Sequence, residues 1–212
     1  MRKFSDFSRI NENLSTMVYK KTPSFDDHQV MSREITLFDM SKPLQLDPPP
    51  ANDSEETRAE ILELKDHIEL ASPEDKHKMI EYDRAFSDDM IRYCLRAGYD
   101  VDYDKLKKLN HESAAIIHHL KYRYNRPRPI QIANKLKIPY NPVPSVTGIT
   151  PSYPSGHSGQ SRLMALFIGE SNPGHRDEIL NIAEEVGLSR LKMGVHFPSD
   201  PEAGVSIGDQ LF

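Results

Sequence analysis

The 212-residue sequence has only one cysteine, Cys94. One cysteine cannot form an internal disulfide, and the lack of disulfides is typical of a protein of the reducing cytoplasm. Long apolar runs are also missing. Uncharged apolar stretches are short, with residues 163–169 as a typical example, whereas crossing a bilayer takes about 20 apolar residues. The sequence therefore argues against an integral membrane protein and predicts no membrane partner.

A secretory signal and an excess of positive charge are missing too. The first residues are basic but are not followed by a continuous apolar core, so we expect a soluble, cytoplasmic protein. The net charge of −5 argues against a general nucleic-acid binder. With 37% hydrophobic and 28% charged residues, the chain is polar but not polar enough for wholesale disorder, and its length suits one domain.

Residues 1–50 show no sustained hydrophobic period and are interpreted as an irregular N-terminal arm laid over the body. Within the arm, residues 33–38 can form a short strand. The prolines at 48–50 end any regular element, because proline lacks an amide donor and restricts the residue before it. The arm can clasp a neighbouring subunit, so a homo-oligomer is an open alternative.

Residues 51–212 show helical spacing of apolar side chains and several helix-start signals. Asp53 or Ser54 can cap a first helix, and Ser72 followed by Pro73 begins a second, which Gly98 ends. Further helices are expected over about 102–123, 130–137, 155–169 and 173–193, and from about 198 onward.

A long loop interrupts these helices, because seven prolines fall within residues 126–154. Loops of that length inside a compact domain are usually functional. We therefore predict an all-α fold, a single-domain helical bundle over 51–212, with the active site at helix ends beside the proline-rich loop.

Three segments combine basic residues, histidine and turn residues, namely 121–129, 154–157 and 189–200. Alone, each has an ordinary interpretation. The cations of the first segment are most often a solvated face, and the tyrosines between them also allow a single-stranded nucleic-acid site. The second segment is a routine helix start that can also bind an anion. His157 in the first helical turn opposes the helix dipole, which suggests a use beyond folding.

Together, the three segments contain the parts of a covalent phosphoryl-transfer site. Such a reaction needs a nucleophile, an acid for the leaving oxygen and cations around the phosphate. A histidine serves as nucleophile when a carboxylate holds its other ring nitrogen, and His196 with Asp200 offers that pair. His157 offers the acid. The cations available for the phosphate oxygens are Lys121, Arg128 and Arg190.

The same segments match three spaced motifs without a substitution: Lys-x6-Arg-Pro at 121–129, Pro-Ser-Gly-His at 154–157 and Ser-Arg-x5-His-x3-Asp at 189–200. In this the sequence resembles the type 2 phosphatidic acid phosphatase and vanadium haloperoxidase superfamily. Residues 48–54 and 152–157 are similar to its soluble bacterial class A acid phosphatase branch. The motifs span about 80 of the 212 residues, and a triple match in this order is far more specific than Pro-Ser-Gly-His alone.

The resemblance implies an all-helical fold and a role for each matched residue. His196 would attack phosphorus and form a phosphohistidine, and Asp200 would orient its ring. His157 would protonate the leaving alkoxide and then activate water. No metal or other cofactor is implied, and vanadate would bind as a phosphate mimic. The implied phosphate-binding residues are Lys121, Arg128, Ser155, Gly156 and Arg190.

We therefore expect a phosphoric monoester hydrolase, a metal-independent acid phosphatase acting on small esters such as nucleotides or sugar phosphates. A vanadium-dependent haloperoxidase would share the oxyanion pocket, although such enzymes are generally much longer. A non-catalytic module that binds nucleic acid or a partner through 121–128 is the non-enzymatic alternative. The adjacent His118 and His119 face different sides of a helix, so we do not expect them to share a metal.

Overall fold

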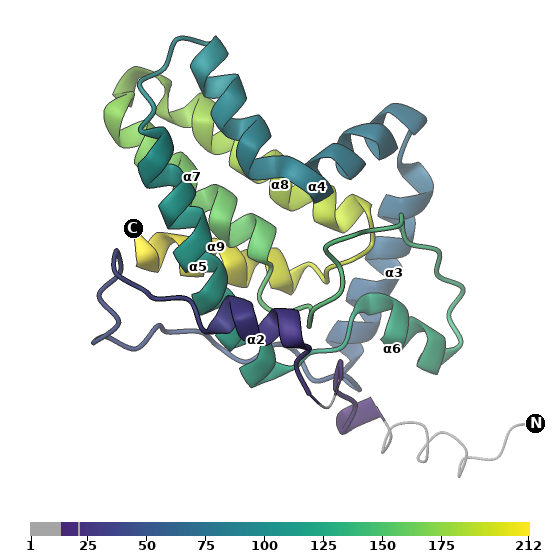
Figure 1. Ribbon diagram of the computed structural model, residues 1–212. Helices are drawn as coiled ribbons and strands as arrows, with labels where there is room; N and C mark the ends of the chain where they lie inside the picture. The colour runs from purple at the N-terminus through teal and green to yellow at the C-terminus, as the bar shows by residue number, and fades with distance from the viewer. Residues whose placement is uncertain (1–13, 21) are drawn as a thin grey trace, which may run out of the picture.

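The computed structural model describes residues 14–20 and 22–212, and every regular element within them is helical (Figure 1). In chain order these elements are α2 (Phe25–Met31), α3 (Glu55–Leu70), α4 (Pro73–Arg96), α5 (Tyr103–Tyr124), α6 (Pro129–Leu136), α7 (Gly156–Ser171), the 3-10 turn η1 (Pro173–His175), α8 (Arg176–Lys192) and α9 (Ser199–Leu211). The described residues form no strand, which confirms the expected all-α fold. None of the helices in these ranges has both the length and the apolar character needed to span a membrane.

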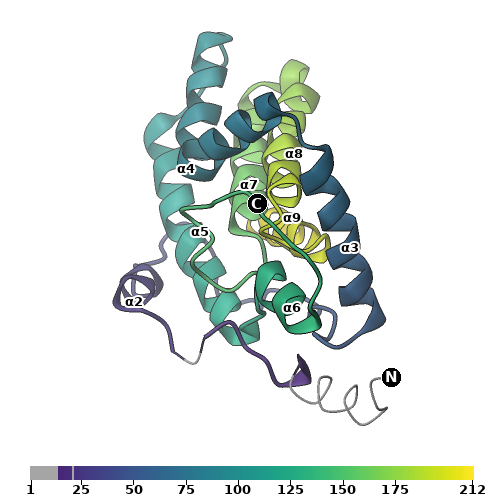
Figure 2. The same ribbon diagram turned by 90° about the vertical axis from the view of Figure 1, so that its right-hand side faces the viewer.

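Helix α7 lies at the centre of the bundle, where it packs against α8, α9, α5 and α4. Figure 2 shows α7, α8 and α9 between α4 and α5 on one side and α3 on the other. Helix α2 packs against the outside of α5. This arrangement brings the ends of α5, α6, α7 and α8 to one region, which the long loop between α6 and α7 crosses (Figure 1).

An unusually close approach joins α7 to α9. A Cβ atom on Gly204 would lie 2.4 Å from the carbonyl oxygen of Ser155, so a larger residue does not fit without a backbone shift. At the same contact the Ser155 amide donates to the carbonyl of Asp200 at 2.9 Å. The start of α7, which carries His157, is therefore held directly against the start of α9.

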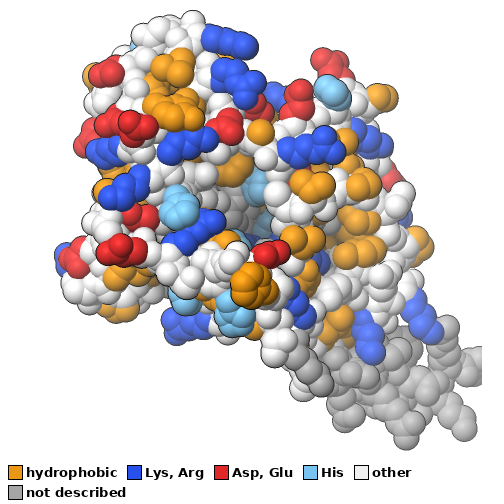
Figure 3. Space-filling view, viewed as in Figure 1, with side chains coloured by type: hydrophobic (Ala, Val, Ile, Leu, Met, Phe, Trp, Pro, Cys, Tyr) orange, Lys and Arg blue, Asp and Glu red, His pale blue; other side chains and the backbone are white. Residues whose placement is uncertain are grey.

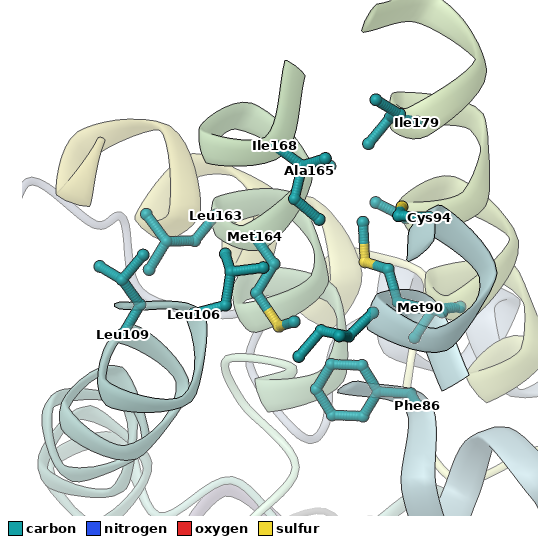
Figure 4. Packing of buried hydrophobic residues seen from close by; sticks show 13 residues of the cluster. Phe86, Met90, Cys94, Leu106, Leu109, Leu163, Met164, Ala165, Ile168 and Ile179 are labelled. Atoms are coloured by element: carbon teal, nitrogen blue, oxygen red, sulfur yellow. The ribbon is translucent and has the colours of Figure 1, made fainter. Parts of the chain in front are cut away.

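The main apolar core lies among α4, α5, α7 and α8 (Figure 4). Burying one Leu, Met or Phe side chain stabilises a fold by about 1.5–3 kcal/mol. The core therefore holds in place the four helices on which much of the candidate site depends. Its labelled side chains are Phe86, Met90, Cys94, Leu106, Leu109, Leu163, Met164, Ala165, Ile168 and Ile179.

Capping side chains start the helices at the positions expected from the sequence. The Ser54 hydroxyl accepts the Thr57 amide at the start of α3. Ser72 forms a capping box at the start of α4, which satisfies two otherwise unpaired amides. Gly98 ends that helix with a φ of +80°, a conformation that favours glycine.

The described part of the N-terminal arm is more regular than expected, because it contains α2, which begins with a capping box at Ser24. Residues 33–38 do not form the possible strand. The Thr36 and Leu37 amides instead donate to the carboxylate of Glu112 on α5, at 2.7 and 2.8 Å. The Glu112 side chain thus accepts backbone amides that would bind a neighbouring strand in a sheet. Residues 1–13 of the predicted arm lie outside the described residues.

Candidate active site

One cavity of about 440 Å³ opens where the ends of α5, α6, α7 and α8 meet. Figure 3 shows a hollow in this face of the molecule with histidine and basic side chains inside it. The structure therefore brings residues of all three sequence segments to one place. The predicted site residues that line the cavity are Lys121, Arg128, Gly156, His157, Arg190 and His196.

His196 lies in the loop between α8 and α9 and is 2% exposed. Its Nδ1 lies 3.1 Å from Oδ2 of Asp200, and its Nε2 lies 3.1 Å from a terminal nitrogen of Arg128. A carboxylate only accepts and a guanidinium only donates, so we assign the proton to Nδ1 and the lone pair to Nε2. Burial and the charge of Arg128 lower the pKa of His196 well below its usual value. The ring is thus held neutral, with an unprotonated Nε2 at the cavity.

Asp200 is fully buried at the start of α9. Its Oδ2 also accepts the Phe197 amide at 2.9 Å, and its Oδ1 accepts the guanidinium of Arg126 at 2.7 Å. Burial alone would raise the pKa of Asp200, but the Arg126 charge and the His196 hydrogen bond outweigh it and hold the pKa low. Asp200 therefore remains a carboxylate that fixes the orientation of the His196 ring.

Arg126 is itself buried, and a second carboxylate balances its charge. Its other terminal nitrogen donates to Glu60 of α3 at 2.8 Å, and its guanidinium lies 3.9 Å above the ring of Phe197. Glu60 also accepts the amide of Ser199 at 2.8 Å. These contacts connect α3 and the loop after α5 to the start of α9. The residues involved are Glu60, Arg126, Phe197 and Ser199.

Lys121 and Arg128 place two buried cations on the cavity wall. The Lys121 ammonium donates to the carbonyls of Pro151 and Ser152 at 2.7 and 3.2 Å. Arg128 donates to the carbonyls of Thr150 and Val195, both at 2.7 Å. Burial and the Arg128 charge lower the pKa of Lys121 well below its usual value, and burial and the Arg190 charge lower that of Arg128 to about 10. The hydrogen-bond partners of these two cations among the described residues are neutral, because Arg128 otherwise meets the His196 ring and the Thr150 hydroxyl. A bound anion would therefore stabilise both cations.

Arg190 of α8 supplies the third cation and is 1% exposed. Its guanidinium pairs with Asp83 of α4 at 2.8 Å. The same carboxylate accepts the Ser145 hydroxyl and the Val146 amide, both at 2.7 Å, and the Thr147 hydroxyl. Asp83 thus binds the proline-rich loop and Arg190 together. The Nε of Arg190 is buried without a hydrogen-bond partner in the described chain.

His157 stands in the first turn of α7 and lines the cavity. Its ring packs 4.7 Å from that of Phe86, and its Nε2 lies 3.3 Å from the carbonyl of Asp83. Burial and the Arg190 charge lower the pKa of His157 well below its usual value. The backbone of α4 departs from helical geometry at Ala85, which bends the helix close to this ring.

Ser155 and Gly156 take different positions. Gly156 lines the cavity, whereas Ser155 does not. The Ser155 hydroxyl caps α7 by accepting the Ser158 amide, and its own amide is bonded to Asp200. A substrate oxygen would therefore meet the backbone of Gly156, while Ser155 holds the helix start in place.

Several residues of the site carry no signal in the predicted motifs. Asp83 and Glu60 look like ordinary acidic residues on helix faces, because their partners are more than 60 positions away. Arg126 stood in the basic segment, but only the fold shows that it pairs with Asp200 rather than facing the cavity. The described residues include no group of three or more His, Cys, Asp or Glu side chains placed to hold a metal ion.

Curated proteins that match part of this chain are named acid phosphatases. Non-specific acid phosphatase of Salmonella typhi is 40% identical over 57 residues, which are 27% of this chain and 23% of that protein. The enzyme of the same name from Providencia stuartii is 44% identical over 52 residues, 24% of this chain and 21% of that protein. The match to this chain thus spans less than a quarter of the length of these curated relatives.

Solved structures share the fold. A bacterial vanadium-dependent iodoperoxidase superposes with a TM-score of 0.65 at 20% identity, over 79% of this chain and 51% of that chain. A transmembrane PAP2-type phosphatidylglycerolphosphate phosphatase from Bacillus subtilis superposes with a TM-score of 0.52 at 22% identity, over 73% of this chain and 81% of that one. A sequence model of the PAP2 superfamily matches residues 112–209. The three motifs lie within that matched region, and residues 112–209 of this chain are therefore similar to the PAP2 superfamily.

Proposed function

We propose that the protein hydrolyses phosphate monoesters without a metal ion, through a phosphohistidine formed on His196. One observation carries this proposal: His196 and three buried cations line one cavity, with an unprotonated imidazole nitrogen among them. A phosphate dianion is the kind of ligand that compensates such buried cations. The names of the acid phosphatases that match part of the chain support the same reaction class.

In the first step, the phosphoryl oxygens bind Lys121, Arg128 and Arg190. An oxygen that takes the Arg128 donor would free the Nε2 lone pair of His196, which then forms a bond to phosphorus. The bond from phosphorus to the ester oxygen breaks, and its electron pair stays on that oxygen. Protonated His157 donates a proton to this oxygen, so the product alcohol leaves neutral.

In the second step, water replaces the alcohol. Neutral His157 accepts a proton from the water as its oxygen bonds to phosphorus, and the bond from phosphorus to Nε2 breaks. Asp200 stabilises the positive charge that the ring of His196 carries while it is phosphorylated. Phosphate leaves, and both histidines return to their starting states. The buried donor at Nε of Arg190 suits the charge that gathers on the phosphoryl oxygens.

The experiment compares hydrolysis of p-nitrophenyl phosphate by the wild-type chain and by the His196→Ala and His175→Ala variants. His175 is the control because it is exposed, stacks on Tyr99 and lies outside the cavity. Removing a covalent nucleophile should lower kcat by about 1,000-fold or more, and the control should stay near wild type. Full activity in His196→Ala would exclude the mechanism.

Two further measurements define the reaction. Acid quenching during turnover of a labelled ester should trap a phosphorylated protein in the wild type and none in His196→Ala. Vanadate should inhibit competitively, because it can occupy the phosphate position as a mimic. Halide oxidation with peroxide and vanadate, in the absence of any ester hydrolysis, would instead assign the cavity to a haloperoxidase reaction.

A further inference from the structure

The outer part of the cavity differs in polarity from the cation cluster. Here the wall includes Asp26 of α2, Arg84 of α4, and His118 and Asn110 of α5, together with Gln160 of α7. These residues lie outside the three motifs. A substrate whose phosphate occupies the cations would place its leaving group against this outer wall.

His118 presents a hydrogen-bond acceptor to the leaving-group region. Its Nδ1 lies 2.8 Å from the carbonyl of Ala114, one turn earlier on α5. A carbonyl only accepts, so the proton is on Nδ1 and the lone pair is on Nε2. Burial, with the nearby Lys121 charge, lowers the pKa of His118 to about 4, so the ring stays neutral near neutral pH. Its remaining nitrogen can therefore accept a hydroxyl proton from a ligand.

Helix α2 carries a second hydrogen-bond acceptor at the same wall, Asp26, next to the buried Asp27. Asp27 is buried and accepts Lys20 at 2.9 Å, the Ser24 amide at 2.7 Å and the Tyr122 hydroxyl at 2.6 Å. These bonds all reach Oδ2 of Asp27 and fasten α2 to α5. The neighbouring Asp26 is exposed and lines the cavity, so its carboxylate is available to a ligand.

The charges at this wall are close to balance. Asp27 pairs with Lys20, and the cavity is lined by both the negatively charged Asp26 and the positively charged Arg84. Gln160 adds a neutral polar group, because its amide nitrogen donates to Asn110 at 2.6 Å and leaves its oxygen as an acceptor. A neutral leaving group is therefore favoured over a strongly charged one.

We propose that the outer wall formed by α2, His118 and Gln160 selects phosphate esters whose leaving group is a neutral, hydroxyl-bearing alcohol. This inference rests on the proposed phosphatase function and assigns its substrate class. The leaving group donates its hydroxyl protons to Nε2 of His118 and to the Asp26 carboxylate, while the phosphoryl group remains with the cations. His118 acts as a specificity residue and takes no part in the bond-breaking steps.

The experiment measures kcat and KM of the full chain for three esters: glycerol 3-phosphate, phenyl phosphate and phosphoglycolate. Their leaving groups are hydroxyl-bearing, apolar and anionic, respectively. The variants are His118→Leu, which removes the acceptor, and His118→Gln, which keeps one. His111→Leu is the matched control, because His111 is an exposed residue of the same helix outside the cavity.

Loss of one good hydrogen bond corresponds to about tenfold in binding. His118→Leu should therefore raise KM for glycerol 3-phosphate about tenfold, change kcat little, and leave both constants for phenyl phosphate within about twofold. His118→Gln should recover most of the loss, and His111→Leu should match wild type. An Asp26→Asn variant should improve phosphoglycolate turnover several-fold, because it removes a negative charge from the wall and keeps the positive charge of Arg84.

Three results would overturn the assignment. Equal losses for glycerol 3-phosphate and phenyl phosphate would mean that His118 supports the phosphate site itself. A wild-type preference for phosphoglycolate over glycerol 3-phosphate would assign the wall to anionic leaving groups. Hydrolysis of none of the three esters by the wild-type chain would reject the proposed function and this inference together, whereas either of the first two results would leave the phosphatase function standing.

Discussion

The two histidines of the candidate site have their pKa values lowered by the same cause, burial beside cations. The consequences differ because their proposed roles differ. A nucleophile must be unprotonated, so a low pKa keeps His196 active in acid. A general acid must be protonated, so a low pKa confines His157 to acidic solution. The proposed reaction therefore needs an unprotonated His196 and a protonated His157 at the same pH, and these two requirements set the pH range of activity.

We therefore predict an acidic pH optimum. As pH rises, His157 loses its proton at a pKa below the usual histidine value, and kcat/KM should fall from acidic to neutral pH. The measurement is kcat/KM for p-nitrophenyl phosphate from about pH 4 to about pH 9, with vanadate affinity followed in parallel. A rate that stays flat from about pH 5 to about pH 9 would contradict the role of His157.

Loss of Arg126 should destabilise the fold strongly. It is buried between Glu60 and Asp200, so Arg126→Met leaves two carboxylates without their counter-charge. Breaking a buried ion pair in this way costs about 3–5 kcal/mol of unfolding free energy. Urea unfolding of Arg126→Met and of Arg123→Met checks this, because Arg123 is exposed on the same segment and should change stability by no more than about 0.5 kcal/mol.

A smaller loss would also be informative. If Arg126→Met unfolds within about 1 kcal/mol of wild type, the two carboxylates must bind protons or water in the variant. The pH dependence of its stability would then separate these cases, since proton uptake by Asp200 would also remove the orientation of His196.

At the scale of elements, one carboxylate on α4 organises the loop that crosses the cavity. Asp83 accepts donors from three successive loop residues at 145–147 and pairs with Arg190 of α8. Burial would raise its pKa, but the Arg190 charge and these hydrogen bonds hold the pKa low. The position of the third cation and the position of the loop therefore depend on the same group.

Asp83→Asn should weaken the site without removing any residue that contacts the phosphate. The amide keeps one acceptor oxygen but loses the charge and cannot accept the loop amide in the same way, so kcat/KM should fall about tenfold or more. Steady-state kinetics checks this against Asp89→Asn, a change on the same helix at a surface pair with Arg92. Wild-type kcat/KM in Asp83→Asn would show that the loop is held without that charge.

At the scale of the whole molecule, acid should destabilise the fold. The pKa values of Asp27, Asp83 and Asp200 are held low, so their contribution is present above the unfolded value of about 3.9 and is lost as pH falls below it. His118, with a pKa lowered to about 4, takes up a proton more readily when unfolded, which lowers stability as pH falls below about 6.5.

Both effects have the same sign, so the urea midpoint should decrease steadily from about pH 7 to about pH 3. Unfolding curves at constant ionic strength test this. A midpoint independent of pH over that range would mean that these groups titrate alike in the folded and unfolded chain. The predicted acidic activity optimum would then be limited by chemistry alone rather than by stability at its lower edge.

Much of the fold could be predicted from local signals. Ser54, Ser72 and Gly98 mark helix ends, and the structure places α5, α6, α7 and α9 within one residue of their expected starts. Such signals suffice because capping and apolar spacing act over a few residues. Helix α2 was missed for the same reason, since its stability depends on contacts with α5 rather than on its own short sequence.

The sequence by itself determined the helical class, the superfamily motifs and the list of groups able to bind and attack a phosphate. Only the tertiary structure decided that Asp83 meets Arg190, that Arg126 faces Asp200 instead of the cavity, and that His118 lies in the wall. The physical reason is that buried charges find partners through packing across distant helices. These partners are far apart in the sequence, so a local sequence pattern does not identify them.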